Sequence, residues 1–86
     1  MTYWVYILRC GDDSLYTGIA TDVDRRLEEH RSGKGAKYTR GRGPLTVVYR
    51  EALPDKGAAL RREAAIKRLS RVEKLRLIEN DGVQTC

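Results

Sequence analysis

Tyr3-Trp4-Val5-Tyr6-Ile7-Leu8 is the stretch of sequence around which the rest of the chain is organised. Every residue in it is apolar or aromatic, and the run is rich in strand formers but too short for an ordinary helix. We therefore predict a β-strand covered on both faces. The composition of Gly11-Asp12-Asp13-Ser14 predicts a turn, and Leu15 to Ile19 is then predicted to return as a second strand. Such a hairpin can bring Tyr6 and Tyr16 onto one sheet.

Length and charge limit the classes of protein to consider. The chain has 86 residues, so we predict a single domain over residues 1–82 and a C-terminal tail over residues 83–86. A net charge of +5 and a pI near 9.5 favour a polyanionic partner, with nucleic acid ahead of an anionic membrane surface. No apolar run approaches the roughly 20 residues of a membrane span and no leader peptide is visible, so we expect a cytoplasmic protein.

The two cysteines, Cys10 and Cys86, form no CxxC pair and have no histidine at zinc spacing. We predict free thiols in a reducing compartment rather than a disulfide or a structural zinc site.

Three helices and a third strand are predicted after the hairpin. Thr21, with Asp24 completing a capping box, opens a helix that ends at Ser32-Gly33. Leu45 to Glu51 is predicted as a strand by its β-branched and aromatic content. Asp55 is predicted to cap a second helix that runs to about Leu69. Ser70 and Glu73 form the capping box of a third helix, which ends at Asn80-Asp81-Gly82. The inward residues of this third helix are predicted to be Val72, Leu75 and Ile78.

Two polar residues lie at the edge of the first helix's apolar face. Val23, Leu27 and His30 share that face, and Arg26 is the neighbour of His30. Each has an ordinary structural explanation: Arg26 as a side chain lying over the core, and His30 as a satisfied histidine at its edge. A functional role for either residue needs support from elsewhere in the chain.

The segment from Gly33 to Gly43 is glycine-rich and basic. It contains Lys34, Lys37, Arg40 and Arg42, and no acid. Glycines let backbone N–H groups approach phosphates, cations neutralise them, and Tyr38 could stack on a base or sugar. The spacing is not that of a Walker loop. A solvated mobile loop is the alternative, but the concentration of uncompensated charge favours a nucleic-acid interface.

Glu63 is an acid on the inward side of a basic helix. It lies four residues after Ala59 and three before Ile66, both of which are predicted to be buried. A charge in that position needs a partner or a metal. The structural alternative is a pair with an arginine such as Arg26.

Taken in order, Tyr6, Tyr16-Thr17-Gly18, Arg26, His30 and Glu63 resemble the GIY-YIG nuclease domain, and the chain is most similar to its small stand-alone branch. The resemblance runs from about Trp4 to Ile78. It implies an α/β (α+β) fold with a small three-stranded antiparallel sheet flanked by three helices.

By that resemblance, the chain is a metal-dependent DNA nuclease that hydrolyses phosphodiester bonds by a one-metal mechanism. Recognition would be directed by DNA structure or backbone, in repair or recombination, on branched, nicked or single-stranded DNA. Glu63 would hold Mg²⁺ or Mn²⁺, and Arg26 would clamp the scissile phosphate. Tyr6 or Tyr16 would accept a proton from the attacking water, and His30 would share that transfer or orient a phosphate.

The sequence departs from the family pattern at three points. Trp4 replaces the glycine of the first tripeptide, Ile19 replaces a lysine found in some members, and an asparagine that follows the glutamate in several branches has no counterpart. The alternative function is therefore a nucleic-acid-binding module with weak or no catalysis. A protein–protein adaptor built on the basic helices is a third possibility.

Overall fold

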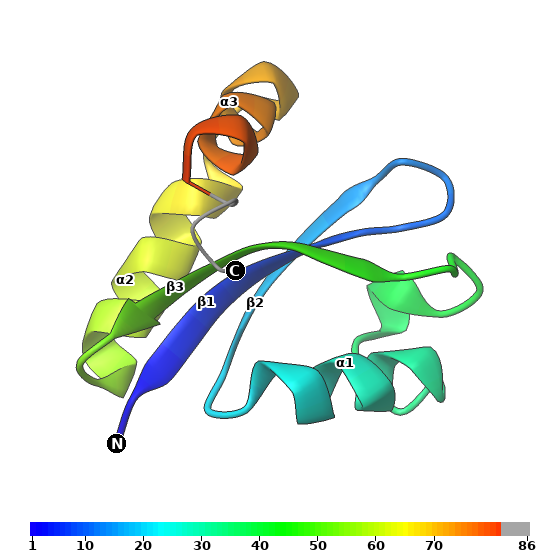
Figure 1. Cartoon of the computed structure of the whole chain (residues 1–86), viewed down its shortest axis with the longest axis horizontal. Coiled ribbons are helices and arrows are strands. Elements are labelled where there is room, and N and C mark those ends of the chain that lie inside the picture. The colour runs from blue at the N-terminus through cyan, green and yellow to red at the C-terminus, as the bar shows by residue number, and fades with distance from the viewer. Residues whose placement is uncertain (82–86) are drawn as a thin grey trace.

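The computed structural model describes residues 1–81. The predicted tail and Cys86 lie outside the described residues, and Cys10 is a buried free thiol. The elements follow the predicted order (Figure 1): β1 (Tyr3–Arg9), β2 (Leu15–Ala20), α1 (Val23–Arg31), the short 3₁₀ helix η1 (Lys37–Thr39), β3 (Thr46–Leu53), α2 (Lys56–Lys67) and α3 (Arg71–Asp81).

The apolar strand β1 is the centre of the sheet. The strand order is β2-β1-β3, and both pairings are antiparallel, as expected. In the hairpin, Tyr6 pairs with Gly18 and Leu8 pairs with Tyr16. The turn is stabilised by the Asp12 carboxylate, which accepts from the Ser14 N–H at 3.0 Å. Helices cover both faces of β1, which explains why nearly every residue of this strand is apolar.

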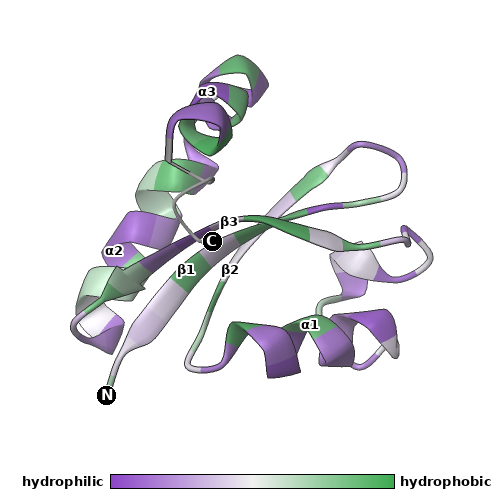
Figure 2. Cartoon of the chain, in the orientation of Figure 1, coloured by the Kyte–Doolittle hydropathy of each residue, from purple (hydrophilic) through white to green (hydrophobic). Residues whose placement is uncertain are grey.

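Alternation along β1 separates two apolar layers. Val5 and Ile7 pack with residues of α2 and α3, whereas Tyr6 and Leu8 pack with Val23 of α1. Figure 1 accordingly shows α1 and the α2–α3 pair on different sides of the strands, and Figure 2 shows apolar positions on the strands and on the helices. Tyr6 therefore belongs to the core and faces α1.

The predicted helix and strand boundaries need small corrections. Asp22, not Thr21, caps α1, because its extended backbone lets its carboxylate accept from the Arg25 N–H at 3.1 Å. The strand β3 begins and ends slightly later than predicted, and α2 ends at Lys67. Asp55 caps α2 as predicted, accepting from the Ala58 N–H at 2.8 Å.

The predicted inward face of α3 was wrong in part. The capping box forms, with Ser70 N–H donating to Glu73 at 2.8 Å, but Val72 and Leu75 are exposed. Ile78 packs on the core as predicted, and Leu77 does so in place of Val72 and Leu75. Because α3 packs against β3, it presents a face rotated by about one residue, or roughly 100°.

Candidate active site

The hairpin brings the two tyrosines together. Tyr6 and Tyr16 are diagonal neighbours across β1 and β2, with ring centroids 6.4 Å apart. Gly18 makes this possible, because a Cβ there would lie 2.7 Å from the Tyr6 hydroxyl oxygen and 3.1 Å from the Tyr16 ring. A glycine opposite Tyr6 thus leaves the space that the tyrosine rings occupy.

His30 completes this cluster from α1. Its Nε2 lies 2.9 Å from the Tyr6 hydroxyl oxygen, and its ring centroid is 5.2 Å from that of Tyr16. On the other side, Nδ1 accepts from the Ala36 N–H at 3.2 Å and contacts Thr39 Oγ1 at 2.9 Å. A backbone N–H can only donate, so the proton of the neutral imidazole is assigned to Nε2. His30 therefore donates to the Tyr6 oxygen.

Burial keeps both partners of this hydrogen bond neutral. Desolvation, and then the charge of Arg26, lowers the pKa of His30 from 6.5. Burial, and then Tyr16, raises the pKa of Tyr6 to about 12, with a smaller contribution from Glu63 and opposition from Arg26. At neutral pH the pair is an imidazole and a protonated phenol.

His30 should make stability depend on pH. As the pH falls below 6.5, the unfolded chain binds a proton at His30 more readily than the folded chain, so the stability present above that pH is lost. We expect the free energy of unfolding in urea to fall between neutral pH and about pH 5. The slope should be shallower in His30→Gln. An identical slope in the variant would contradict a buried neutral imidazole.

Arg26 and Glu63 flank the tyrosines from different helices. The partly exposed Arg26 donates to Glu29 at 2.8 Å and interacts with the Tyr6 hydroxyl. Both contacts raise the pKa of Arg26, and the contact with Glu29 has the larger effect. The Glu63 side chain is 19% exposed and lies 3.5 Å from Lys67 Nζ. Glu63 is thus on the inward side, as predicted. The Arg26–Glu63 pair considered from sequence is wrong, because each residue has another partner.

Glu63 would have to bind a metal with little help from other side chains. Within residues 1–81, no group of three or more His, Cys, Asp or Glu residues is arranged to hold an ion. A single carboxylate still fits Mg²⁺ or Mn²⁺, because Mg²⁺ keeps several waters and takes oxygen atoms from substrate phosphate. The donor chemistry therefore fits a cation completed by water and substrate.

The basic loop is folded over the tyrosines. Tyr38, on η1, has its ring centroid 5.8 Å from that of Tyr16, and the Arg42 guanidinium lies 4.4 Å from the Tyr38 centroid. Arg42 also pairs with Asp12 of the hairpin turn. Lys34, Lys37 and Arg40 are exposed on the same loop. Of the five loop residues predicted to bind nucleic acid, the structure brings Tyr38 and Arg42 to the tyrosine cluster.

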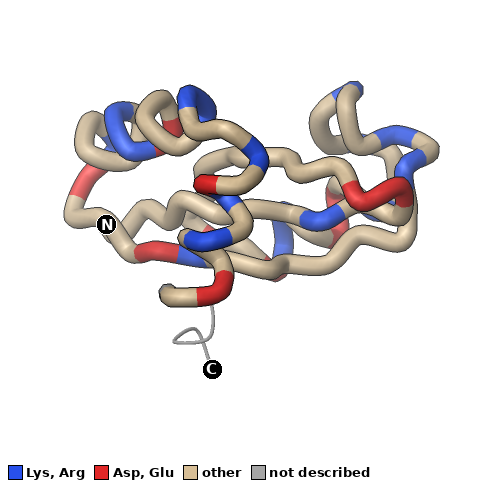
Figure 3. The backbone as a smooth tube through the Cα atoms, turned by 90° about the horizontal axis from the view of Figure 1, so that it is seen from above, with Lys and Arg blue, Asp and Glu red and all other residues tan. Residues whose placement is uncertain are grey.

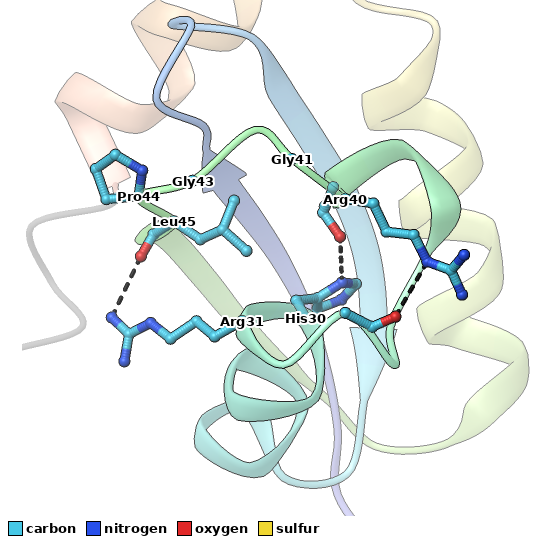
Figure 4. Close-up of a pocket in the computed structure, with 9 residues that line it drawn as sticks. His30, Arg31, Arg40, Gly41, Gly43, Pro44 and Leu45 are labelled. Carbon is cyan, nitrogen blue, oxygen red and sulfur yellow. Dashed lines mark hydrogen bonds between the residues drawn. The ribbon is translucent and has the colours of Figure 1, made fainter.

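Behind His30, a cavity of about 440 Å³ shows how the loop is held (Figure 4). Arg31 donates to the Leu45 carbonyl at 3.3 Å, and Arg40 donates to the Gly33 carbonyl at 3.0 Å. Arg31 therefore ties the end of α1 to the chain just before β3, and Arg40 ties the loop to its own backbone. Arg40 thus has a structural contact in addition to its predicted role.

Two positioning residues were not predicted. Thr39 is buried with its Oγ1 2.9 Å from both His30 Nδ1 and the Ala36 carbonyl oxygen, and its single hydroxyl proton is donated to one of these acceptors at a time. A side chain at Gly35 would collide with the imidazole, because a Cβ there would overlap the ring. Their signal in the sequence is weak, since Thr and Gly are common in any loop. Only the folded loop shows that they fix the His30 ring.

Comparisons with known proteins show the family of the chain. Residues 2–76 match the family described as the GIY-YIG catalytic domain. UPF0213 protein BH0048 of Halalkalibacterium halodurans is 55% identical over 82 residues, covering 95% of this chain and 87% of the relative. UPF0213 protein NP_0776A of Natronomonas pharaonis is 51% identical over 79 residues, covering 92% and 93%.

Two solved structures are similar. The solution NMR structure of UPF0213 protein BH0048 from Bacillus halodurans has a TM-score of 0.63 at 55% identity and covers 95% of this chain and 87% of that one. The NMR structure of protein EF2693 from E. faecalis has a TM-score of 0.61 at 38% identity and covers 90% and 83%. Within residues 1–81, no helix has the length and apolar character needed to cross a bilayer.

Proposed function

The chain belongs to the GIY-YIG catalytic domain family, and from this we propose that it is a metal-dependent DNA nuclease that acts in repair or recombination. The family supports a nuclease-type function and a nucleic-acid substrate. The DNA substrate, the cation and the cellular process are the finer parts of the proposal. The observation that carries it is the cluster in which Tyr6, Tyr16 and His30 contact one another. The charges of Arg26 and Glu63 act on the pKa of Tyr6 in this cluster.

Tyr16 is the general base in this proposal: its hydroxyl first loses its proton to solvent, and the oxygen then accepts the proton of the attacking water. Tyr6 is only 1% exposed, and its pKa of about 12 keeps its proton in place. Tyr16 is partly exposed, so an attacking water can reach its hydroxyl. Tyr6, whose oxygen accepts from His30, keeps its own O–H to donate into the site. The two tyrosines therefore have different roles, a base and a fixed donor.

Arg26 is the clamp for the scissile phosphate. Its guanidinium is anchored on Glu29 through one nitrogen, and its planar fork retains further N–H groups for phosphate oxygens. The anchoring limits the side chain's freedom before substrate arrives. Arg26 can thus position the phosphate beside Tyr6 and Tyr16.

Glu63 would hold the divalent cation. When bound, such a cation stabilises negative charge on the phosphate and on the leaving oxygen. Lys67, 3.5 Å from the carboxylate, is 54% exposed and can move into water when a stronger cation arrives. The carboxylate is therefore available as a ligand at little cost in stability.

Cleavage of a panel of labelled DNAs tests the proposed function. Single-stranded, duplex, nicked, flapped and four-way substrates would each be incubated with Mg²⁺, with Mn²⁺ and with a chelator. We expect products only with a divalent cation, because one arginine cannot alone offset the negative charge of the transition state and the Glu63 carboxylate adds to that charge. Equal cleavage in chelator would contradict the metal-dependent mechanism.

The departures at Ile19 and after Glu63 favour a second function, nucleic-acid binding without cleavage. In that case the panel would remain uncut with every cation, while binding would be tight and weaken steeply with salt. Binding would also be unaffected by neutralising Glu63. The same substrates, analysed on native and denaturing gels, separate the two functions.

A further inference from the structure

A groove lies between the basic loop, the start of β2 and the start of α3. It is lined by Ser14, Leu15, Tyr38, Arg71 and Lys74, and its volume is about 210 Å³. Pockets that hold a whole small ligand usually enclose roughly 300–1,000 Å³. The groove is therefore suited to one small part of a longer molecule.

Two of the residues that line the groove are cations on α3. Arg71 and Lys74 lie in its first turn, where the helix dipole disfavours positive charge. Within residues 1–81, neither forms an ion pair with an acid. The acid of that turn, Glu73, is engaged by the N–H of Ser70. An anion such as a phosphate would supply the missing compensation.

The other wall of the groove is aromatic and apolar. Tyr38 is 44% exposed, and its ring also carries the Arg42 guanidinium at 4.4 Å. Leu15, which is partly buried against the core, lines the groove together with Tyr38. Tyr38 also packs against Tyr16, with ring centroids 5.8 Å apart, so the groove adjoins the tyrosine cluster. Cations beside an exposed aromatic ring are the usual means by which proteins hold an unpaired nucleotide. Figure 3 shows that Lys and Arg lie both on the helices and on the loops, so cations can reach the groove from both kinds of element.

We propose that this groove binds one unpaired nucleotide of the substrate strand. The base packs on Tyr38 and Leu15, and the phosphate lies between Arg71 and Lys74. The inference rests on the nuclease function proposed above and narrows its substrate to nucleic acid with an unpaired nucleotide beside the cut. A base inside a duplex has both faces stacked and cannot enter without being extruded.

Fluorescence anisotropy in chelator tests the groove without cleavage. The probes are a dye-labelled single-stranded oligonucleotide and the blunt duplex of the same sequence. Lys74→Glu and Tyr38→Ala should each weaken single-strand binding about tenfold, the effect of losing one stacked base or one phosphate contact. Duplex binding should change by less than about twofold.

Arg76→Glu is the matched control. Arg76 is exposed on the same helix, about 200° around its axis from Lys74, and does not line the groove. Arg76→Glu makes the same change of charge as Lys74→Glu but lies outside the groove, so it should weaken binding by less than about twofold. Tyr38→Phe should retain binding, because the ring is kept. Thermal melts would verify that each variant is folded.

Two outcomes would overturn the inference. Equal weakening by Lys74→Glu and Arg76→Glu would show that only net charge matters. Equal losses for single strand and duplex in Tyr38→Ala would show that the groove does not distinguish an unpaired base. If either outcome were found together with metal-dependent cleavage, the nuclease function would be supported and the proposed role of the groove rejected. The expected binding pattern without cleavage would support the groove and reject the nuclease.

Discussion

Replacing Glu63 with glutamine should reduce metal-dependent DNA cleavage by about a thousandfold, because cation stabilisation of the transition state is worth several kcal/mol and each 1.4 kcal/mol is tenfold in rate. Glutamine keeps the shape of the side chain and removes its charge. The fold should survive, since the partner of Glu63 is Lys67, whose side chain is 54% exposed and returns to water. Initial rates on the best substrate of the DNA panel would measure the effect.

Glu79→Gln is the control for this change. Glu79 is exposed on α3 and undergoes the same chemical substitution away from the tyrosine cluster. Its cleavage rate should match that of the unmodified chain, and the melting temperatures of all three proteins should be similar. Retention of full metal-dependent cleavage by Glu63→Gln would show that the cation is held elsewhere.

Gly18→Ala should damage both stability and activity. The new Cβ would lie 2.7 Å from the Tyr6 hydroxyl oxygen and 2.9 Å from Cζ, and the buried Tyr6 ring has little room to retreat. Overpacking of this kind costs about 1–3 kcal/mol. Displacing the Tyr6 hydroxyl also breaks its hydrogen bond with His30. Urea unfolding and cleavage rates would measure the two effects.

Gly43→Ala is the matched control, because a Cβ at Gly43 would have open space and the backbone φ there is not positive. It should change stability by less than about 0.5 kcal/mol. In the double variant Tyr6→Phe with Gly18→Ala, part of the steric conflict is removed. The double variant should be more stable than the sum of the single changes predicts. Strict additivity would contradict the proposed clash.

Much of the fold could be predicted because local signals and tertiary packing agree. The apolar run of β1, the alternation around Tyr6, and the caps at Asp55 and Ser70 each specify the element that forms. The orientation of α3 was harder to predict, because Val72 and Leu75 are as apolar as Leu77 and Ile78. Which of these faces becomes buried depends on how the helix meets β3, and helical periodicity does not determine that.

The candidate site divides in the same way. The tyrosines, Arg26, His30 and Glu63 are ordered by spacing and could be proposed from sequence. The ion-pair partners of Arg26 and Glu63 could not be predicted, because Glu29 and Lys67 were only two of many charged residues in the sequence. The contribution of the loop to His30 comes from a main-chain N–H, that of Ala36, which no side-chain pattern reveals.

The burial of Tyr6 has a consequence for how this lineage can lose its chemistry. Tyr6 packs in the centre of the sheet, and His30 fills the space between α1 and the loop, so selection for stability favours keeping both. Within residues 1–81, Glu63 pairs only with a solvent-exposed lysine, and selection for folding alone does not preserve it. Inactive descendants should therefore keep the tyrosine pair and the histidine, and first lose the glutamate. On the proposed function, the tyrosines would identify the fold in surveys of genomes, whereas the glutamate would identify the enzymes.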